Sequence, residues 1–150
     1  MTKLACRYAV VQFMPYSQTG EFANVGVVLA CPTTGYFGFL LQTRNFARVT
    51  AFFDELPTNV YLTAIQAIHD ELKRIQALNG RTSGERKAEH LRAVFDALIH
   101  PREAIIRFGA ARAVLTSSPE EELQRLFDDY VDRVRPASKI VAAQGQQALN

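Results

Sequence analysis

The chain has 150 residues, of which 48% are hydrophobic and 21% charged, and its formal net charge is +2 at pH 7. This composition excludes a disordered protein and indicates a soluble domain with its own core. No apolar run reaches the roughly 20 residues that a membrane-spanning helix needs. Arg7, Gln12 and Pro15 interrupt the N-terminal apolar stretch, unlike in a secretory signal. We therefore expect a cytoplasmic protein without a membrane partner.

Three apolar segments open the chain and predict a meander of antiparallel strands. They cover residues 4–14, 21–29 and 36–41, and turn residues separate them at 16–20 and 31–35. Side chains alternate between the two faces of a strand, and in the first two strands both faces are largely apolar. Such a sheet must be covered on both faces, by helices or by a second subunit.

Two glycines stand inside these predicted strands. Strict alternation places Gly26 on the same face as Phe22, Asn24 and Val28. Because glycine is disfavoured in the middle of a strand, we expect a helix or a second subunit to approach Gly26 closely. Gly38 in the third strand indicates a bulge or a close backbone contact.

Helical spacing of apolar side chains follows in three segments. It predicts a short helix within residues 44–53, a long one over 58–78 and a third over 88–98. An Asn-Gly pair at 79–80 predicts the end of the long helix, and Pro101 predicts the end of the third.

A late strand and a last helix complete the pattern. Residues 104–116 are typical of a strand, and the Gly-Ala-Ala run at 109–111 predicts a kink or bulge in it. Ser118, Pro119 and Glu121 then match a capping box at the start of a helix. The buried stripe predicted for this helix consists of Leu123, Leu126, Phe127, Tyr130, Val131 and Val134.

Together these elements predict an α+β fold. Its antiparallel sheet consists of the N-terminal three-strand meander and one late strand, packed with about four helices. We expect a single α+β domain over residues 1–136. The remaining residues, 137–150, are polar and rich in Gln and Ala, which predicts a frayed C-terminal tail.

Glu21 and Asn24 are the most unusual polar pair of the chain. They could bind a cation, a base edge or the backbone of a partner. In the structural alternative, Asn24 bonds a neighbouring loop, while Glu21 pairs with Arg7 or Arg107. Residues three apart on a strand point to opposite faces, so a shared site needs an irregular backbone. We favour the structural alternative, because buried polar groups are normally satisfied locally.

Basic residues are unevenly distributed along the chain. Residues 1–53 hold four of them against one acid, and residues 81–112 hold seven against four. Arginine can bind phosphate or carboxylate with two hydrogen bonds, or it can pair with a local acid. The candidate binding residues are Arg7, Glu21, Asn24, Arg44, Arg48, Arg107 and Arg112.

Catalytic and metal-binding patterns are not visible in the sequence. It contains no Gly-x-Ser-x-Gly, phosphate-binding loop or paired carboxylates, and its three histidines lack the spacing of a helical metal site. Cys6 and Cys31 are either a redox pair or, as we favour, two small buried residues in a reducing compartment. We expect no catalytic residue, no metal and no cofactor.

Residues 8–15 and 20–29 carry a tyrosine-led strand that ends in proline, followed by Gly-Glu-Phe-x-Asn-x-Gly-Val. This pattern resembles the opening of the domain-of-unknown-function 3037 family of small bacterial and phage proteins. The likeness continues through residues 105–116 and the helix from Ser118, so that it covers most of residues 4–134. The resemblance implies no established activity. It implies a partner or accessory role in a toxin–antitoxin or defence setting, because family members are often encoded beside HipA-like kinases.

We therefore expect a non-enzymatic protein-binding or regulatory module of bacterial or phage origin. Its partner would be another protein, such as a HipA-like kinase, or a second copy of the chain in a homo-oligomer. The alternative is a nucleic-acid-binding protein that uses arginines of the sheet and its loops. A hydrolase or nuclease that uses Glu21 has the least support.

Overall fold

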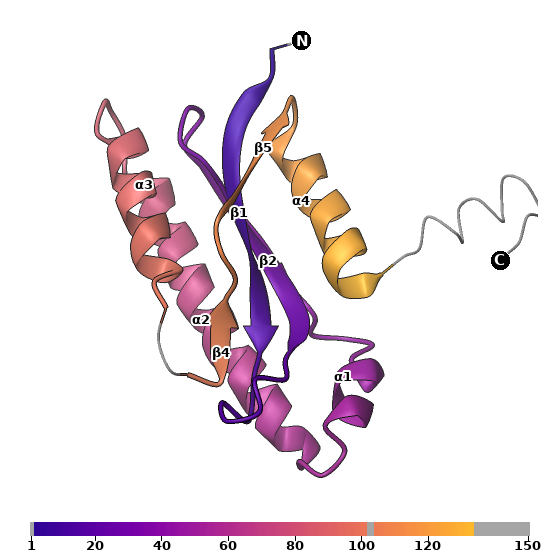
Figure 1. The fold of residues 1–150 in the computed structure, drawn as a ribbon. Helices are drawn as coiled ribbons and strands as arrows, with labels where there is room; N and C mark the ends of the chain where they lie inside the picture. Colours follow the sequence, from indigo (N-terminus) through magenta and orange to yellow (C-terminus); the bar gives the residue numbers. More distant parts are fainter. Residues whose placement is uncertain (1, 102–103, 134–150) are drawn as a thin grey trace, which may run out of the picture.

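The computed structural model describes residues 2–101 and 104–133, and an antiparallel sheet lies at its centre (Figure 1). Strand β1 (Leu4–Phe13) is the middle strand, with β2 (Ala23–Cys31) and then β3 (Tyr36–Leu41) on one side. Two short strands, β4 (Ile106–Phe108) and β5 (Arg112–Thr116), pair with β1 on its other side. This arrangement confirms the predicted meander with a late strand beside it.

The late strand is divided where the Gly-Ala-Ala run predicted a kink. The Gly109 N–H donates to the Val10 carbonyl at 2.8 Å, and after this contact Arg112 pairs with Tyr8. Residues 109–111 therefore step from β4 to β5, while both strands stay beside β1.

Helices cover both faces of the sheet (Figure 1). On one face lie α1 (Ala47–Phe52), α2 (Thr58–Arg81) and α3 (Lys87–Leu98). The other face carries α4 (Pro119–Phe127), which continues into a π-helix, η1 (Asp128–Asp132). The apolar cover that the sequence requires on both faces is thus supplied by helices of the same chain.

Each face of the sheet has its own apolar core. On the α2–α3 face, β1 contributes Ala9, Val11 and Phe13, and the Phe13 ring packs edge-on against Tyr61 of α2. On the α4 face, Cys6 and Tyr8 pack with a second buried cluster that includes Leu123, Leu126 and Val131. Burial of apolar area contributes about 25 cal/mol per Å², so both layers stabilise the sheet.

The strict alternation predicted for β2 is wrong because the strand contains a bulge. Val11 of β1 lies opposite Gly26, but the next residue, Gln12, lies opposite Asn24. Val25 is therefore the extra residue, and a bulge of this kind shifts the side chains beyond it to the other face. Asn24 consequently faces α4, whereas Gly26 faces the α2–α3 side.

The residue that approaches Gly26 also differs from the expectation. A Cβ atom at Gly26 would lie 2.5 Å from Leu41 Cδ2 and 2.7 Å from the Leu40 carbonyl oxygen. Both atoms belong to the neighbouring strand β3, so the close contact comes from within the sheet. Neither a helix nor a second subunit is needed to explain the glycine, because Leu41 lies directly opposite it.

The long helix α2 continues past the Asn-Gly pair that was expected to end it. Asn79 is buried, and its Nδ2 donates to the Gly35 carbonyl oxygen at 2.9 Å. This bond holds the last turn of α2 against the turn between β2 and β3. The helix ends only at Arg81, because the tertiary contact outweighs the local preference of Asn-Gly for a helix end.

The start of α4 confirms Ser118 as the capping residue and Pro119 as the first helical residue. Ser118 Oγ accepts a hydrogen bond from the Glu121 N–H at 3.3 Å. In a capping box the Glu121 side chain would in turn accept a hydrogen bond from the Ser118 N–H. Here the Ser118 N–H donates to Thr116 Oγ1 at 3.0 Å instead. A strand residue thus supplies half of the cap.

In the predicted stripe of the last helix, Leu123, Leu126 and Val131 are buried, while Phe127 and Tyr130 are half-buried. Val134 and the predicted tail at 137–150 lie outside the described residues. Among the described helices, none has the length and apolar character needed to cross a membrane.

Candidate functional site

Asn24 fastens the end of the α4–η1 helix to the sheet. Its Nδ2 donates to the Tyr130 carbonyl oxygen at 3.3 Å, and Arg48 Nη2 donates to the Val131 carbonyl oxygen at 2.9 Å. The last carbonyls of a helix lack partners within it, so both contacts satisfy groups that would otherwise need water. The Arg48 guanidinium also suits the negative end of the helix dipole.

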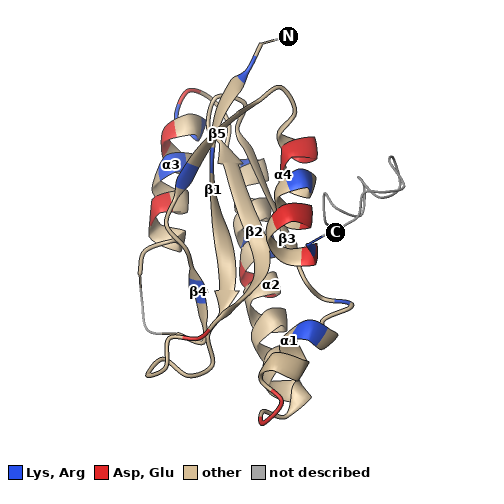
Figure 2. Ribbon diagram, turned by 45° about the vertical axis from the view of Figure 1, so that its right-hand side comes forward, with Lys and Arg blue, Asp and Glu red and all other residues tan. Residues whose placement is uncertain are grey.

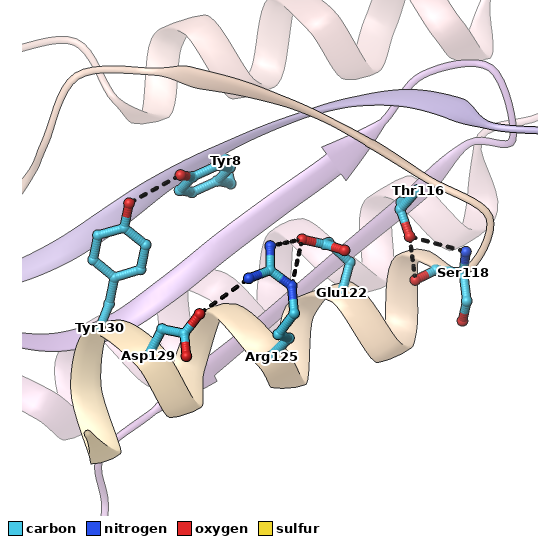
Figure 3. A network of polar contacts seen from close by, with 7 residues as sticks. All are labelled: Tyr8, Thr116, Ser118, Glu122, Arg125, Asp129 and Tyr130. Carbon is cyan, nitrogen blue, oxygen red and sulfur yellow. Dashed lines mark hydrogen bonds and ion pairs between the residues drawn. The ribbon is translucent and has the colours of Figure 1, made fainter. Parts of the chain in front are cut away.

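Tyr130 contacts the sheet through its side chain as well (Figure 3). Its hydroxyl lies 3.0 Å from the hydroxyl of Tyr8, and the two ring centroids are 6.0 Å apart. Burial, together with this hydrogen bond, raises the pKa of Tyr8 to about 12. On the same helix, Arg125 Nη1 donates to Asp129 Oδ2 at 3.0 Å and Arg125 also binds Glu122. The position of Tyr130 is therefore fixed by contacts of both its backbone and its ring.

Two open pockets adjoin the contact between Asn24 and Tyr130. Their volumes are about 630 and about 220 Å³, and both are lined by Phe22, Asn24 and Tyr130. The larger extends over α1 and the smaller toward β5. The residues that we group as the Tyr130 surface are Phe22, Asn24, Arg48, Phe52, Arg112, Tyr130 and Arg133.

The larger pocket has exposed aromatic rings at its edge. Phe22 is 45% exposed and Phe52 is 58% exposed. The Phe52 ring packs edge-on against the buried ring of Phe53, with a centroid separation of 4.8 Å, which limits its freedom. Exposed apolar side chains that gather within a polar rim are typical of interaction sites.

Three of the residues predicted from the sequence meet on this surface, namely Asn24, Arg48 and Arg112. Arg107 lies on the same face of the sheet, since it pairs across the strands with Gln12, and its Nε donates to the Ala104 carbonyl oxygen at 2.9 Å. The bulge and the helix end, which are far apart in sequence, bring these groups together.

The other predicted residues lie elsewhere. Arg7 lies on the α3 side, where Nη1 is 2.8 Å from Asp96 Oδ1 and the guanidinium stands 5.0 Å from the centroid of the Phe95 ring. It thus pairs with Asp96 and not with Glu21. Glu21 and Arg44 are exposed and, as far as the structure describes the chain, do not line the Tyr130 surface.

Four residues of the surface were not among the predicted site residues: Phe22, Phe52, Tyr130 and Arg133. Phe52 could have been found, because it lies off the apolar helical stripe formed by Phe46, Val49 and Phe53. Tyr130 was assigned to a buried stripe, and the sequence gives no signal for the π-helix that places its carbonyl beside Asn24.

The charged side chains that line the Tyr130 surface are arginines, while carboxylates lie on the neighbouring helix. The described helix α4 with η1 carries acidic and basic residues in close succession (Figure 2). Asp132 Oδ1 accepts a hydrogen bond from Gln42 Nε2 at 3.1 Å, close in sequence to Arg133. The surface therefore combines arginines with nearby carboxylates, and its field is not of a single sign.

The cysteines and acidic residues give little support to a reactive thiol or a metal site elsewhere in the described structure. Cys6 and Cys31 are both free and buried. Burial and a hydrogen bond with Cys31 raise the pKa of Cys6 to about 12, so this thiol stays protonated near neutral pH and is a poor nucleophile. Within residues 2–101 and 104–133, no group of three or more His, Cys, Asp and Glu side chains could hold a metal ion.

Residues 8–131 match the model of a protein family described as protein of unknown function (DUF3037). The chain therefore belongs to the DUF3037 family. No curated protein and no solved structure matches it. The matched segment includes the bulge of β2, the whole of α4 and Tyr130, so the structural elements that form the Tyr130 surface fall almost entirely within it.

Proposed function

We propose that this member of the DUF3037 family is a non-enzymatic protein-binding module and that its partner binds at the Tyr130 surface. The observation that carries the proposal is the pair of exposed rings, Phe22 and Phe52, at the edge of one open pocket. Aromatic residues and arginine are enriched in the energetic centres of protein interfaces. Arg48 and Arg133 line the same pocket.

The chemistry of the surface favours a partner segment with apolar side chains for the two rings and an acidic group for the arginines. The nearby carboxylates favour a protein over a polyanion, because a phosphate backbone would be repelled by them. The partner to test first is any HipA-like kinase that is encoded beside the gene, because the family resemblance implies such a neighbour; a complex with it would make the protein an accessory of a toxin–antitoxin or defence system. A second copy of the chain is the alternative partner.

The test is to titrate the purified HipA-like kinase with the wild-type protein and with Phe22→Ala and Phe52→Ala. Truncation of a central interface residue costs about 2 kcal/mol or more, so each variant should bind at least about tenfold more weakly. Because both rings are exposed, the melting temperature should stay close to that of the wild type.

Leu115→Ala is the matched control, since Leu115 is 63% exposed but lies on β5 opposite Ala5, outside the Tyr130 surface. It should bind like the wild type. Sedimentation of the protein alone tests self-association with the same variants. The proposal fails if neither the kinase nor a second copy binds, or if the Phe22 and Phe52 variants bind as well as Leu115→Ala.

A nucleic-acid-binding function remains the second candidate, favoured by the gathering of Arg48, Arg112 and Arg133 beside aromatic rings. Aromatic rings can stack on unpaired bases, while arginines bind phosphates. This function predicts mobility shifts with single-stranded DNA or RNA that weaken steeply as salt rises, and a clear loss in Arg112→Gln. Absence of a shift at low salt would exclude it.

A further inference from the structure

A separate cavity lies on the other face of the sheet, between α2, α3 and β4. Its volume is about 500 Å³, which is within the roughly 300–1,000 Å³ typical of small-molecule sites. Its walls are mainly apolar and include Ile68, Ile75, Val94, Leu98 and Phe108. None of these residues belongs to the Tyr130 surface, so a ligand here would bind independently of the proposed protein partner.

The apolar wall continues to the mouth of the cavity, where Leu78 is 40% exposed. Among the described residues that line the cavity, Glu71 and Arg74 carry opposite charges and bind each other, with Arg74 Nε 3.1 Å from Glu71 Oε1. Contact between water and apolar side chains costs about 25 cal/mol per Å² of apolar surface. A bound apolar molecule would exclude this water and so remove the cost. The cavity thus favours an uncharged, mainly apolar ligand.

Asn79 also lines this cavity and adds a polar side chain to its apolar walls. The residue is 7% exposed, and the bond from its Nδ2 to the Gly35 carbonyl fixes the orientation of the amide. Its Oδ1 is buried and, within the described part of the chain, has no hydrogen-bond partner. Buried acceptors without a partner are rare, because each loses its hydration without compensation.

From the cavity and this unpartnered oxygen we propose that the protein binds a small, uncharged, mainly apolar molecule that carries one O–H or N–H donor. The apolar body fills the space between α2, α3 and β4, and the donor reaches the Asn79 oxygen. Because Oδ1 is buried, neighbouring side chains would have to move for the donor to reach it.

The proposal can be tested with naphthol and with its methyl ether, which has a similar shape but lacks the donor. Calorimetric titration of the full chain should show saturable binding of naphthol. Its affinity should exceed that of the ether by about two- to tenfold, the value of one net hydrogen bond. In Asn79→Leu, which removes the acceptor, the two compounds should bind equally.

Two substitutions on α3 locate the site. Ala97 lines the cavity and is exposed, so Ala97→Phe should block the mouth, remove naphthol binding and leave the circular dichroism unchanged. Ala93 is exposed one turn earlier and does not line the cavity, so Ala93→Phe should bind naphthol like the wild type. Absence of naphthol binding, binding unaffected by Ala97→Phe, or equal affinity of the wild type for both compounds would each overturn the proposal.

Discussion

Asn24 and Gly26 are two residues apart in β2 but have different contacts on opposite faces of the sheet. Asn24 donates to a helix carbonyl on the α4 side, while Gly26 allows β3 to approach on the α2–α3 side. The bulge at Val25 makes both contacts compatible with one strand. The spacing of these residues therefore has a structural cause, and Asn24 contributes to the candidate surface mainly by positioning Tyr130.

Gly26→Ala should lower the free energy of unfolding by about 1–3 kcal/mol, the scale of overpacking in a filled core. The added Cβ would lie 2.7 Å from the Leu40 carbonyl oxygen, a backbone atom that cannot rotate away. Gly80→Ala is the control, because a Cβ at Gly80 in α2 would meet no atom within 4 Å. This variant should gain about 0.5–1 kcal/mol from helix propensity. Urea unfolding of both variants checks the pair, and a Gly26→Ala protein as stable as the wild type would contradict it.

At the scale of helices and strands, the periodicity of the sequence predicted each long element, and the division of the late strand followed from its Gly-Ala-Ala run. The errors occur where a tertiary contact overrides a local signal. Helix α2 continues past Asn79 because the Asn79 side chain bonds the Gly35 carbonyl. In the cap of α4, Thr116 accepts the hydrogen bond that was expected to go to the Glu121 side chain. The π-helix could not be predicted, since its carbonyls depend on Asn24 and Arg48 from distant elements.

Asn24→Ala tests how η1 is held on the sheet. Loss of the amide leaves the Tyr130 carbonyl without this donor, so we expect a loss of about 1–3 kcal/mol of stability. The loss should be local, with faster amide hydrogen exchange in residues 128–132 than in α2. Asn59→Ala is the control because Asn59 is exposed in the first turn of α2, and its stability should stay within about 0.5 kcal/mol of the wild type. Unchanged exchange in η1 of Asn24→Ala would show that the contact does not hold the helix.

At the scale of the whole molecule, the two apolar faces of the sheet predicted a cover on both sides, but the sequence left open whether helices or a subunit supply it. The structure resolves this through the helices of the chain itself. The Tyr130 surface was only partly predictable. Its residues come from β2, α1, β5 and η1, and their meeting depends on how these elements pack, which no local pattern encodes.

Packing on both faces also buries several groups that ionise at alkaline pH. Burial and the bond with Cys31 raise the pKa of Cys6 to about 12, and burial raises the pKa of Tyr61 above its usual range. Burial and the Tyr130 bond likewise raise the pKa of Tyr8 to about 12. In the unfolded chain these groups lose their protons at lower pH, near 9 for cysteine and 10 for tyrosine.

Above about pH 9 the unfolded chain therefore binds fewer protons than the folded protein, so its stability should fall as pH rises toward 12. Each group that is ionised only in the unfolded chain contributes a slope of about 1.4 kcal/mol per pH unit. Below about pH 9 the contribution is fully present, and no such slope is expected from these groups.

Urea unfolding at intervals between about pH 8 and about pH 11 measures the slope. Cys6→Val keeps an apolar side chain but removes one titrating group, so its alkaline slope should be shallower. Leu115→Ala, at an exposed site without a titrating group, should retain the wild-type slope. Equal slopes in the wild type and Cys6→Val would mean that Cys6 ionises as readily in the folded protein as in the unfolded chain. The α4 face would then be more open to water than its packing indicates.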